Sequence, residues 1–161
     1  MEKDFFADIF DEQGDENFEI LTEEEKDIEI EQKISGPVRG NIENLLINGR
    51  LTRNISFAGH EFVIKTLTVG EELAVAEVCA SFAGSIAEAR ALATATVAAS
   101  LESVDGLALM RSLGPDATAS VRQKFNFIKN KWYWNIIGHI YQEYLGLVEE
   151  QMAAFEALQG K

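Results

Sequence analysis

The sequence predicts a mainly α-helical fold: a bundle of about four helices with one N-terminal β-hairpin, preceded by an acidic extended arm. A hydrophobic share of 47% with ten Phe among 161 residues is sufficient for one domain with a substantial core. A short stretch near residue 55 alternates apolar and polar residues, whereas later and longer stretches repeat apolar residues every three or four positions. The net charge is −13, and most of it lies at the N-terminus.

The excess acid belongs to an N-terminal arm, residues 1–36, which we expect to be flexible and to bind partners. Residues 1–35 carry fourteen Asp and Glu against three Lys, whereas residues 36–161 carry thirteen acids and eleven bases. Like charges at the density of the arm repel one another and oppose collapse onto a private core. A solvated tail that only aids solubility is the alternative. Clusters of large apolar side chains interrupt the acids and are candidate anchors in a partner: Phe5, Phe6, Ile9, Phe10, Phe18, Ile20 and Leu21.

A second domain, residues 37–161, is expected to begin at the breaker Ser35-Gly36-Pro37. Apolar and polar residues alternate over 51–57 and again over 61–65, with an Ala-Gly-His turn between the two stretches. This pattern predicts a β-hairpin. The hairpin must pack on the helices, because a lone hairpin is only marginally stable in water.

Helix signals follow the hairpin. Thr68 and Glu71 form a capping box, in which each side chain bonds to the backbone amide of the other residue. The stretch 85–101 consists almost entirely of Ala, Thr, Val and Leu, and we expect it to be a buried central helix because small side chains let helices approach closely. The expected helices cover residues 42–47, 69–82, 85–101, 117–130 and 131–158, with the last two either continuous or bent near Lys131.

The charge balance argues against two classes of partner. Nucleic-acid binding needs clustered Lys and Arg that displace counterions from phosphates, and docking on anionic lipid needs a similar cluster. We therefore expect neither nucleic acid nor membrane as a partner. No window approaches 18 uncharged apolar residues, and the acidic start has no apolar signal region, so we expect no spanning helix and no secretion signal.

Few residues suggest catalytic chemistry. Cys79 is the single cysteine and fits a small buried hydrophobe in a reducing compartment. His60 falls in the predicted hairpin turn, and His139 lies four residues before Glu143, the spacing of a surface pair on a helix. Glycine-rich nucleotide-binding motifs and the metalloprotease and serine-hydrolase patterns are absent from the sequence. We expect a protein that is not an enzyme and that uses no cofactor and no metal.

A small basic and aromatic patch is the candidate binding site within the domain. Lys129, Lys131 and Trp132 lie at its centre, with Lys124 and Tyr133 beside them. In an otherwise acidic chain, a local excess of positive charge is suited to an acidic partner or to the chain's own arm.

Three segments, in this order, resemble a class of small proteins of tailed bacteriophages. Residues 51–72 read Leu-x-Arg-x-Ile-x-Phe-x-Gly-His-Glu-Phe-x-Ile-Lys-Thr-Leu-Thr-Val-Gly-Glu-Glu. Residues 93–106 read Ala-x-Ala-Thr-Val-Ala-Ala-Ser-Leu-Glu-Ser-Val-Asp-Gly, and residues 141–147 read Tyr-x-x-Tyr-x-x-Leu. Members of the class are described as tail assembly chaperones, baseplate hub components or virion structural proteins. The resemblance covers about residues 41–158 and leaves out the arm.

The resemblance implies a non-enzymatic structural or assembly protein of a phage tail or baseplate. Its implied partners are other phage structural proteins, of the tail tube, hub or baseplate, and it leaves open whether the chain is oligomeric in the assembly. The implied location is the virion, or the host cytoplasm during assembly. One alternative is a cytoplasmic tail assembly chaperone that is absent from the mature virion. Another, motivated by the charge of the arm, is an acidic mimic of nucleic acid that inhibits a host enzyme.

Overall fold

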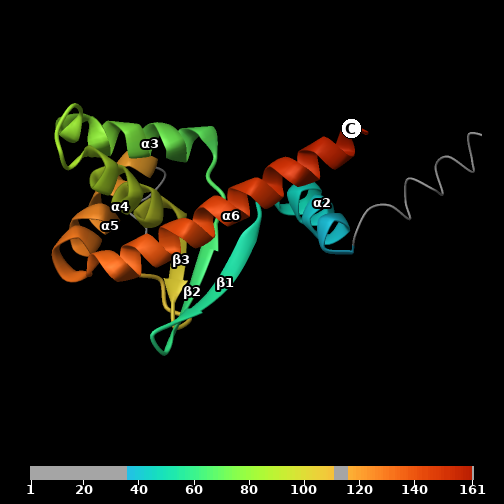
Figure 1. The fold of residues 1–161 in the computed structure, drawn as a ribbon, viewed down its shortest axis with the longest axis horizontal. Coiled ribbons are helices and arrows are strands. Elements are labelled where there is room, and N and C mark those ends of the chain that lie inside the picture. The colour runs from blue at the N-terminus through green and yellow to red at the C-terminus, as the bar shows by residue number, and fades with distance from the viewer. Residues whose placement is uncertain (1–35, 111–115, 161) are drawn as a thin grey trace, which may run out of the picture. The chain divides into compact units, whose positions relative to one another are not determined.

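The structure, a computed structural model, describes residues 36–110 and 116–160 (Figure 1). These residues belong to one compact unit, Ser35–Lys161. The predicted flexible, partner-binding arm therefore lies outside the described residues, together with its proposed anchors Phe5, Phe6, Ile9, Phe10, Phe18, Ile20 and Leu21.

Five α-helices and a small three-stranded antiparallel sheet make up the described part of the chain, which confirms the prediction of a mainly helical fold. Figure 1 shows α3, α4 and α5 gathered at one end of α6, with the sheet beside the middle of α6. In chain order the elements are α2 (Gly36–Asn48), β1 (Thr52–Phe57), β2 (His60–Lys65), α3 (Val69–Cys79), the 3-10 helix η1 (Ala80–Phe82), α4 (Glu88–Ser100), β3 (Leu101–Val104), α5 (Ala117–Lys131) and α6 (Trp134–Leu158).

The predicted hairpin is present as β1 and β2, which pair in antiparallel register with Ile55 opposite Phe62. Its two turn residues, Ala58 and Gly59, both have positive φ, at 53° and 81°. A two-residue turn of that kind matches the right-handed twist of the flanking strands. The hairpin forms part of a larger sheet, because β3 pairs with the other edge of β2.

Strand β3 is absent from the sequence-based prediction, which extended the preceding helix to Leu101. The strand has only four residues and follows α4 without a linker, so no alternating pattern distinguishes it. After β3 the chain reverses in a tight turn at Asp105-Gly106, where both residues have positive φ. Val104 and Leu107 exchange backbone hydrogen bonds of 2.8 and 2.9 Å across it.

The predicted buried central helix is confirmed as α4, which packs against α3, α5 and α6. Its described side chains from Ala93 to Ser100 are all buried. The helix begins at Glu88 and not at Ser85, because residues 85–87 form a turn. In that turn the Ser85 hydroxyl donates to the Phe82 carbonyl at 2.7 Å, and the Glu88 carboxylate accepts from the Gly84 amide at 2.8 Å.

The start of α2 differs from the prediction, and the structure decides whether α5 and α6 are continuous. Helix α2 begins at Gly36, several residues before the predicted start, because Pro37 fits the first turn of a helix, where its missing N–H would be unused. Helices α5 and α6 are separate. The backbone of Trp132 and Tyr133 is extended, with ψ of 148° and 152°.

Arg53 connects the hairpin to α6. Its Nη1 donates to the backbone carbonyl and to Oε2 of Glu143, both at 2.9 Å, and its Nη2 donates to Oε1 of Glu150 at 2.6 Å. The predicted surface pair between His139 and Glu143 is therefore wrong. Glu143 pairs with Arg53, and the ring of His139 stacks on Phe57 with centroids 4.3 Å apart.

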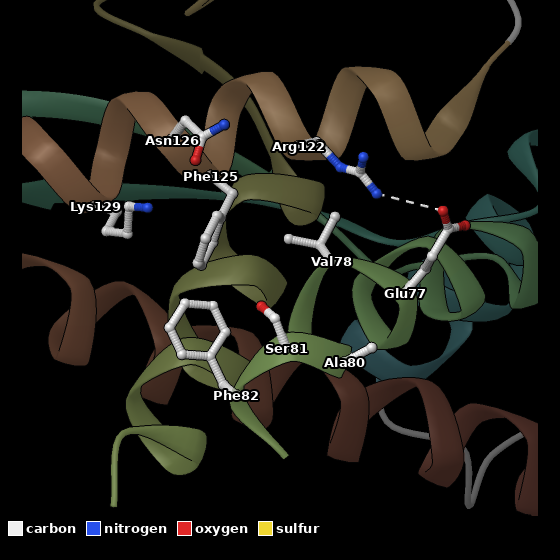
Figure 2. Close-up of a pocket in the computed structure, with 9 residues that line it drawn as sticks. All are labelled: Glu77, Val78, Ala80, Ser81, Phe82, Arg122, Phe125, Asn126 and Lys129. Carbon is white, nitrogen blue, oxygen red and sulfur yellow. Dashed lines mark hydrogen bonds and ion pairs between the residues drawn. The ribbon is translucent and has the colours of Figure 1, made fainter. Parts of the chain in front are cut away.

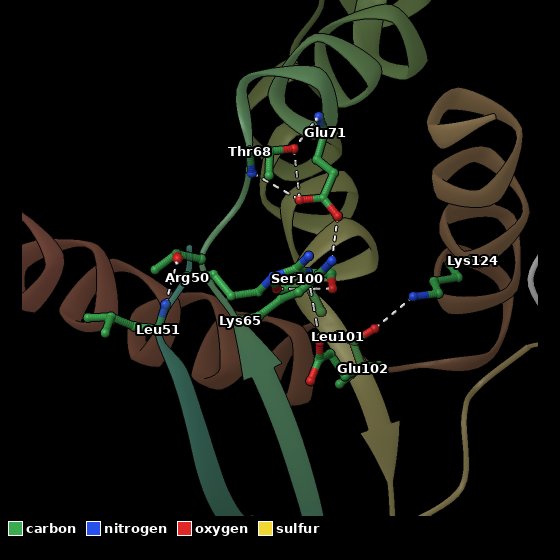
Figure 3. Close-up of polar contacts among 11 residues, drawn as sticks. Arg50, Leu51, Lys65, Thr68, Glu71, Ser100, Leu101, Glu102 and Lys124 are labelled. Carbon is green, nitrogen blue, oxygen red and sulfur yellow. Dashed lines mark hydrogen bonds and ion pairs between the residues drawn. The ribbon is translucent and has the colours of Figure 1, made fainter. Parts of the chain in front are cut away.

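The capping box at the start of α3 is confirmed and is shown in Figure 3. The Glu71 amide donates to Thr68 Oγ1 at 3.3 Å, and the Thr68 amide donates to Glu71 Oε2 at 2.9 Å. Lys65, at the end of β2, also donates to the Glu71 carboxylate, so one side chain joins the strand to the helix. Burial alone would raise the pKa of Glu71, but the hydrogen bonds from Lys65 and Thr68 and the charge of Lys65 lower it below its ordinary value.

Replacing Glu71 by Gln should remove an acid-sensitive part of the free energy of unfolding. Since the folded-state pKa lies below the ordinary value of 4.5, the carboxylate stabilises the fold above that pH and loses its effect as the pH falls through the folded-state pKa. The difference in unfolding free energy between wild type and Glu71→Gln should be largest near neutral pH and shrink below pH 4.5. Urea unfolding at a series of pH values measures this, and a constant difference would contradict it.

Replacing Arg53 by Met should lower the free energy of unfolding by about 1–3 kcal/mol, because the change removes charged hydrogen bonds but keeps an apolar stem. Arg39→Met is the matched control, since Arg39 makes only an exposed contact with Glu43 on the same helix, at 3.6 Å. The control should change the free energy by less than about 0.5 kcal/mol. Equal effects of the two variants would show that Arg53 does not hold the hairpin on α6.

Candidate protein-docking groove

The residues of the predicted basic and aromatic patch do not lie together: some pack against the sheet and others are exposed. Lys124 points inward, and its Nζ donates to the Leu101 carbonyl at 2.7 Å (Figure 3). Burial, and then the nearby charge of Lys65, lower the pKa of Lys124. Trp132 is half-buried and packs edge-to-face on Phe62 with ring centroids 5.9 Å apart. Both side chains therefore support the sheet.

Of the three residues predicted at the centre of the patch, Lys129 and Lys131 remain exposed. Lys129 lines a cavity, beside residues that the prediction did not include. Tyr133 is exposed at the break between α5 and α6. The candidate site is thus centred on Lys129 and not on Trp132.

A cleft of about 440 Å³ lies between α5 on one side and α3 with η1 on the other (Figure 2). Phe82 and Phe125 meet edge-to-face at its apolar end, with ring centroids 6.0 Å apart. A second cavity of about 140 Å³ uses the same two rings and Lys129, and it is bounded by Arg90 on α4. We call the two cavities together the docking groove; its remaining lining residues are Glu77, Val78, Ala80, Ser81, Ala87, Ala91, Thr94, Arg122 and Asn126.

Three cations border the docking groove: one is in an ion pair, and two lie over aromatic rings. Arg122 Nη2 lies 3.3 Å from Glu77 Oε1 in an exposed ion pair, drawn in Figure 2. Lys129 Nζ lies 5.3 Å from the ring centroid of Phe125. The Arg90 guanidinium lies 5.1 Å from the ring centroid of Trp134. Contacts of this kind place a cation over an aromatic ring without using its hydrogen-bond donors.

Among residues 36–110 and 116–160, neither Arg90 nor Lys129 lies within ion-pair distance of a carboxylate. Within the part of the chain that the structure describes, these two cations are not neutralised by an ion pair. The docking groove thus combines apolar rings with unneutralised positive charge, in a chain whose net charge is −13. This chemistry suits an apolar side chain flanked by carboxylates.

The aromatic and arginine residues of the docking groove were missed from sequence because they come from three separate elements. Part of the signal was present within α5. Arg122, Phe125 and Lys129 are spaced by three and four residues, which places them on one face of a helix. Phe82 and Arg90 lie beside these three residues only because α3, η1 and α4 pack against α5.

Outside the docking groove, His60 and Asp105 form a pair at the tip of the sheet. His60 Nδ1 lies 2.7 Å from Asp105 Oδ2, and Asp105 Oδ1 accepts from the Glu61 amide at 2.9 Å, so the pair ties two turns together. These hydrogen bonds, with the backbone bond first, lower the pKa of Asp105. Burial raises the pKa of the Cys79 thiol, which disfavours the reactive thiolate.

In the described portion of the chain, no group of His, Cys, Asp and Glu side chains is arranged to hold a metal ion. None of the helices in that portion combines the length and the apolar character needed to cross a membrane. Comparison with models of known protein families, with curated proteins and with solved structures finds no match for this chain.

Proposed function

We propose that this chain is a non-enzymatic structural or assembly protein of a bacteriophage tail or baseplate, which binds other virion proteins through its helical domain and its acidic arm. The observation that carries the binding role is the docking groove, where exposed cations surround a pair of aromatic rings. The phage assignment rests on the resemblance of residues 51–72, 93–106 and 141–147.

The resembling segments and the docking groove support different parts of the proposal. The segments build the hairpin, the start of α3, most of α4 with β3, and the middle of α6, and they contribute part of the core. The residues that give the docking groove its charge and its rings, between Glu77 and Arg90 and between Arg122 and Lys129, lie outside the segments. The resemblance therefore supports the class of protein, and the docking groove supports the chemistry of its partner.

The partner that fits the docking groove is a protein segment with one apolar anchor and neighbouring carboxylates. Burial of a single Phe or Leu side chain contributes about 1.5–3 kcal/mol, and association costs several kcal/mol in lost freedom of motion. One such contact is weak and reversible. Repetition around a tail, or a second contact through the arm, would raise the effective concentration of the segment and so the overall affinity.

The charge distribution counts against the nucleic-acid mimic. Residues 36–161 carry a net charge of only −2, and the docking groove adds exposed cations to that surface. A mimic would therefore depend on residues 1–35 alone. The chaperone alternative shares the binding chemistry of the main proposal and differs in whether the protein remains in the finished particle.

A pair of charge reversals at the docking groove, Arg90→Glu with Lys129→Glu, should weaken binding of acidic virion proteins, because the variant repels the carboxylates that the wild type attracts. The measurement is affinity capture by the full-length chain from infected cells, followed by identification of the captured proteins. Capture of tail or baseplate proteins by the wild type should fall at least about 10-fold in the double variant.

Arg39→Glu is the matched control, because it reverses an exposed charge on α2, away from the docking groove, and should leave capture unchanged. Mass spectrometry of purified particles then separates the two roles. Stoichiometric presence identifies a structural component, and absence identifies a chaperone. Equal capture by the double variant and the wild type, or capture without any virion protein, would refute the proposal.

A further inference from the structure

A third cavity, of about 230 Å³, lies between α3, α4 and α6. Helices α3 and α6 each pack on α4 but make little contact with each other, so the space between them is only partly filled. Side chains of all three helices line this space. We call the cavity the tyrosine pocket, because Tyr141 and Tyr144 line it from α6. None of its lining residues belongs to the docking groove, so the two sites are separate.

The wall of the tyrosine pocket combines aliphatic surface with one negative charge. Leu67, Val75 and Leu92 supply the aliphatic surface, from the linker before α3, from α3 and from α4. Glu72 is the one formally charged residue that lines the pocket, and its side chain is exposed. An apolar cavity beside a carboxylate is complementary to a short alkyl chain that ends in a positive charge.

The ionisation of Tyr144 reflects the electrostatic potential in the tyrosine pocket. The Tyr144 side chain is buried. Burial, and then the negative charge of Glu72, raise the pKa of Tyr144 to about 12. A carboxylate that disfavours a phenolate at this point stabilises a cation there through the same Coulomb interaction. The tyrosine pocket therefore has the opposite sign to the docking groove, which Arg90 and Lys129 border.

Two phenol rings add to the preference for a cation. Tyr141 and Tyr144 are three residues apart on α6, so their side chains are neighbours on the helix surface, and both line the cavity. An aromatic ring attracts an ammonium group through its negative face, and the attraction increases where water is excluded. Two rings and a carboxylate around one cavity thus favour a cation over a neutral or acidic group of the same shape.

Exposed leucines at the edge of the tyrosine pocket favour a protein segment over a free amine. Leu92 lines the pocket and is 45% exposed. Leu73 is 66% exposed and lies three residues before Ala76, which lines the pocket, so Leu73 is next to the cavity on the surface of α3. A free amine would leave both leucines in water. A protein segment can cover them while one of its side chains fills the cavity.

We propose that the tyrosine pocket binds a lysine side chain of a partner protein. The alkyl stem of the lysine occupies the apolar cavity, and its ammonium group lies beside Glu72 and the two tyrosine rings. Apolar neighbours of the lysine in the partner cover Leu73 and Leu92. This inference is independent of the docking groove and of the phage assignment.

The first test is an NMR titration of the full-length chain with n-butylammonium, which has the shape and charge of the lysine side chain. The comparators are n-butanol, which has the same shape without charge, and butyrate, which is an anion. n-Butylammonium should shift the signals of the residues that line the pocket and bind at least about 5-fold more tightly than n-butanol. Equal or tighter binding of n-butanol or butyrate would show that the pocket takes an apolar or an acidic group, and it would overturn the proposal.

Replacing Glu72 by Gln should weaken binding of n-butylammonium at least about 3-fold and leave n-butanol unaffected, because the change removes the charge and keeps the shape. Glu149→Gln is the matched control, since Glu149 is an exposed carboxylate on α6 that does not line the pocket. The control should bind n-butylammonium like the wild type. An equal loss in both variants would show that the overall negative charge of the chain, and not the pocket, attracts the cation.

A short peptide with one lysine between two leucines then distinguishes a protein segment from a free amine. The peptide should bind at least about 10-fold more tightly than n-butylammonium, because its leucines bury further apolar surface. Acetylation of the lysine removes the charge and should reverse most of this gain. A lysine peptide that binds no more tightly than n-butylammonium, or an acetylated peptide that binds equally well, overturns the proposal.

Discussion

Three helices contact α4 at once, and this constraint determines much of the rest of the structure. A helix in that position can carry only side chains small enough for its neighbours to approach, and the run from Ala91 to Ser100 contains nothing larger than Val97 and Leu92. Leu92 is the larger of the two, and it points outward. The position of α4 sets the positions of α3 and α5, and their separation creates the docking groove. It also sets the start of β3, because the strand follows the helix with no residue between them.

The parts of the fold that could be predicted from sequence are those encoded by neighbours along the chain. Alternation predicted β1 and β2, and the capping box placed the start of α3 at Val69. The composition of α4 predicted its burial. Each of these signals involves residues within a few positions of one another, so no knowledge of packing was needed.

The parts that could not be predicted depend on contacts between distant residues. Strand β3 exists because β2 offers an unpaired edge, a fact that four residues cannot encode. Glu143 lies at helical spacing from His139, but it pairs instead with Arg53, ninety positions away, whose Nη1 donates to both the carboxylate and the backbone carbonyl of Glu143. The candidate site follows the same rule. Lys129 was identified because it lies in a local basic cluster, whereas Phe82 and Arg90 join it only through the packing of η1 and α4 against α5.

Gly146 lies directly beneath the Arg53 guanidinium. A Cβ atom at this position would come within 3.2 Å of Arg53 Nη1, so the bare backbone provides a notch that the arginine occupies. Sliding α6 by one turn relative to the hairpin would place Gln142, Glu143, Glu149 or Glu150 at the notch and close it. The next glycine on the helix, Gly138, is eight residues away, a displacement of about 12 Å. The bare backbone of Gly146 therefore favours the alignment in which Arg53 lies over it, because a side chain at this point of α6 would press on the guanidinium.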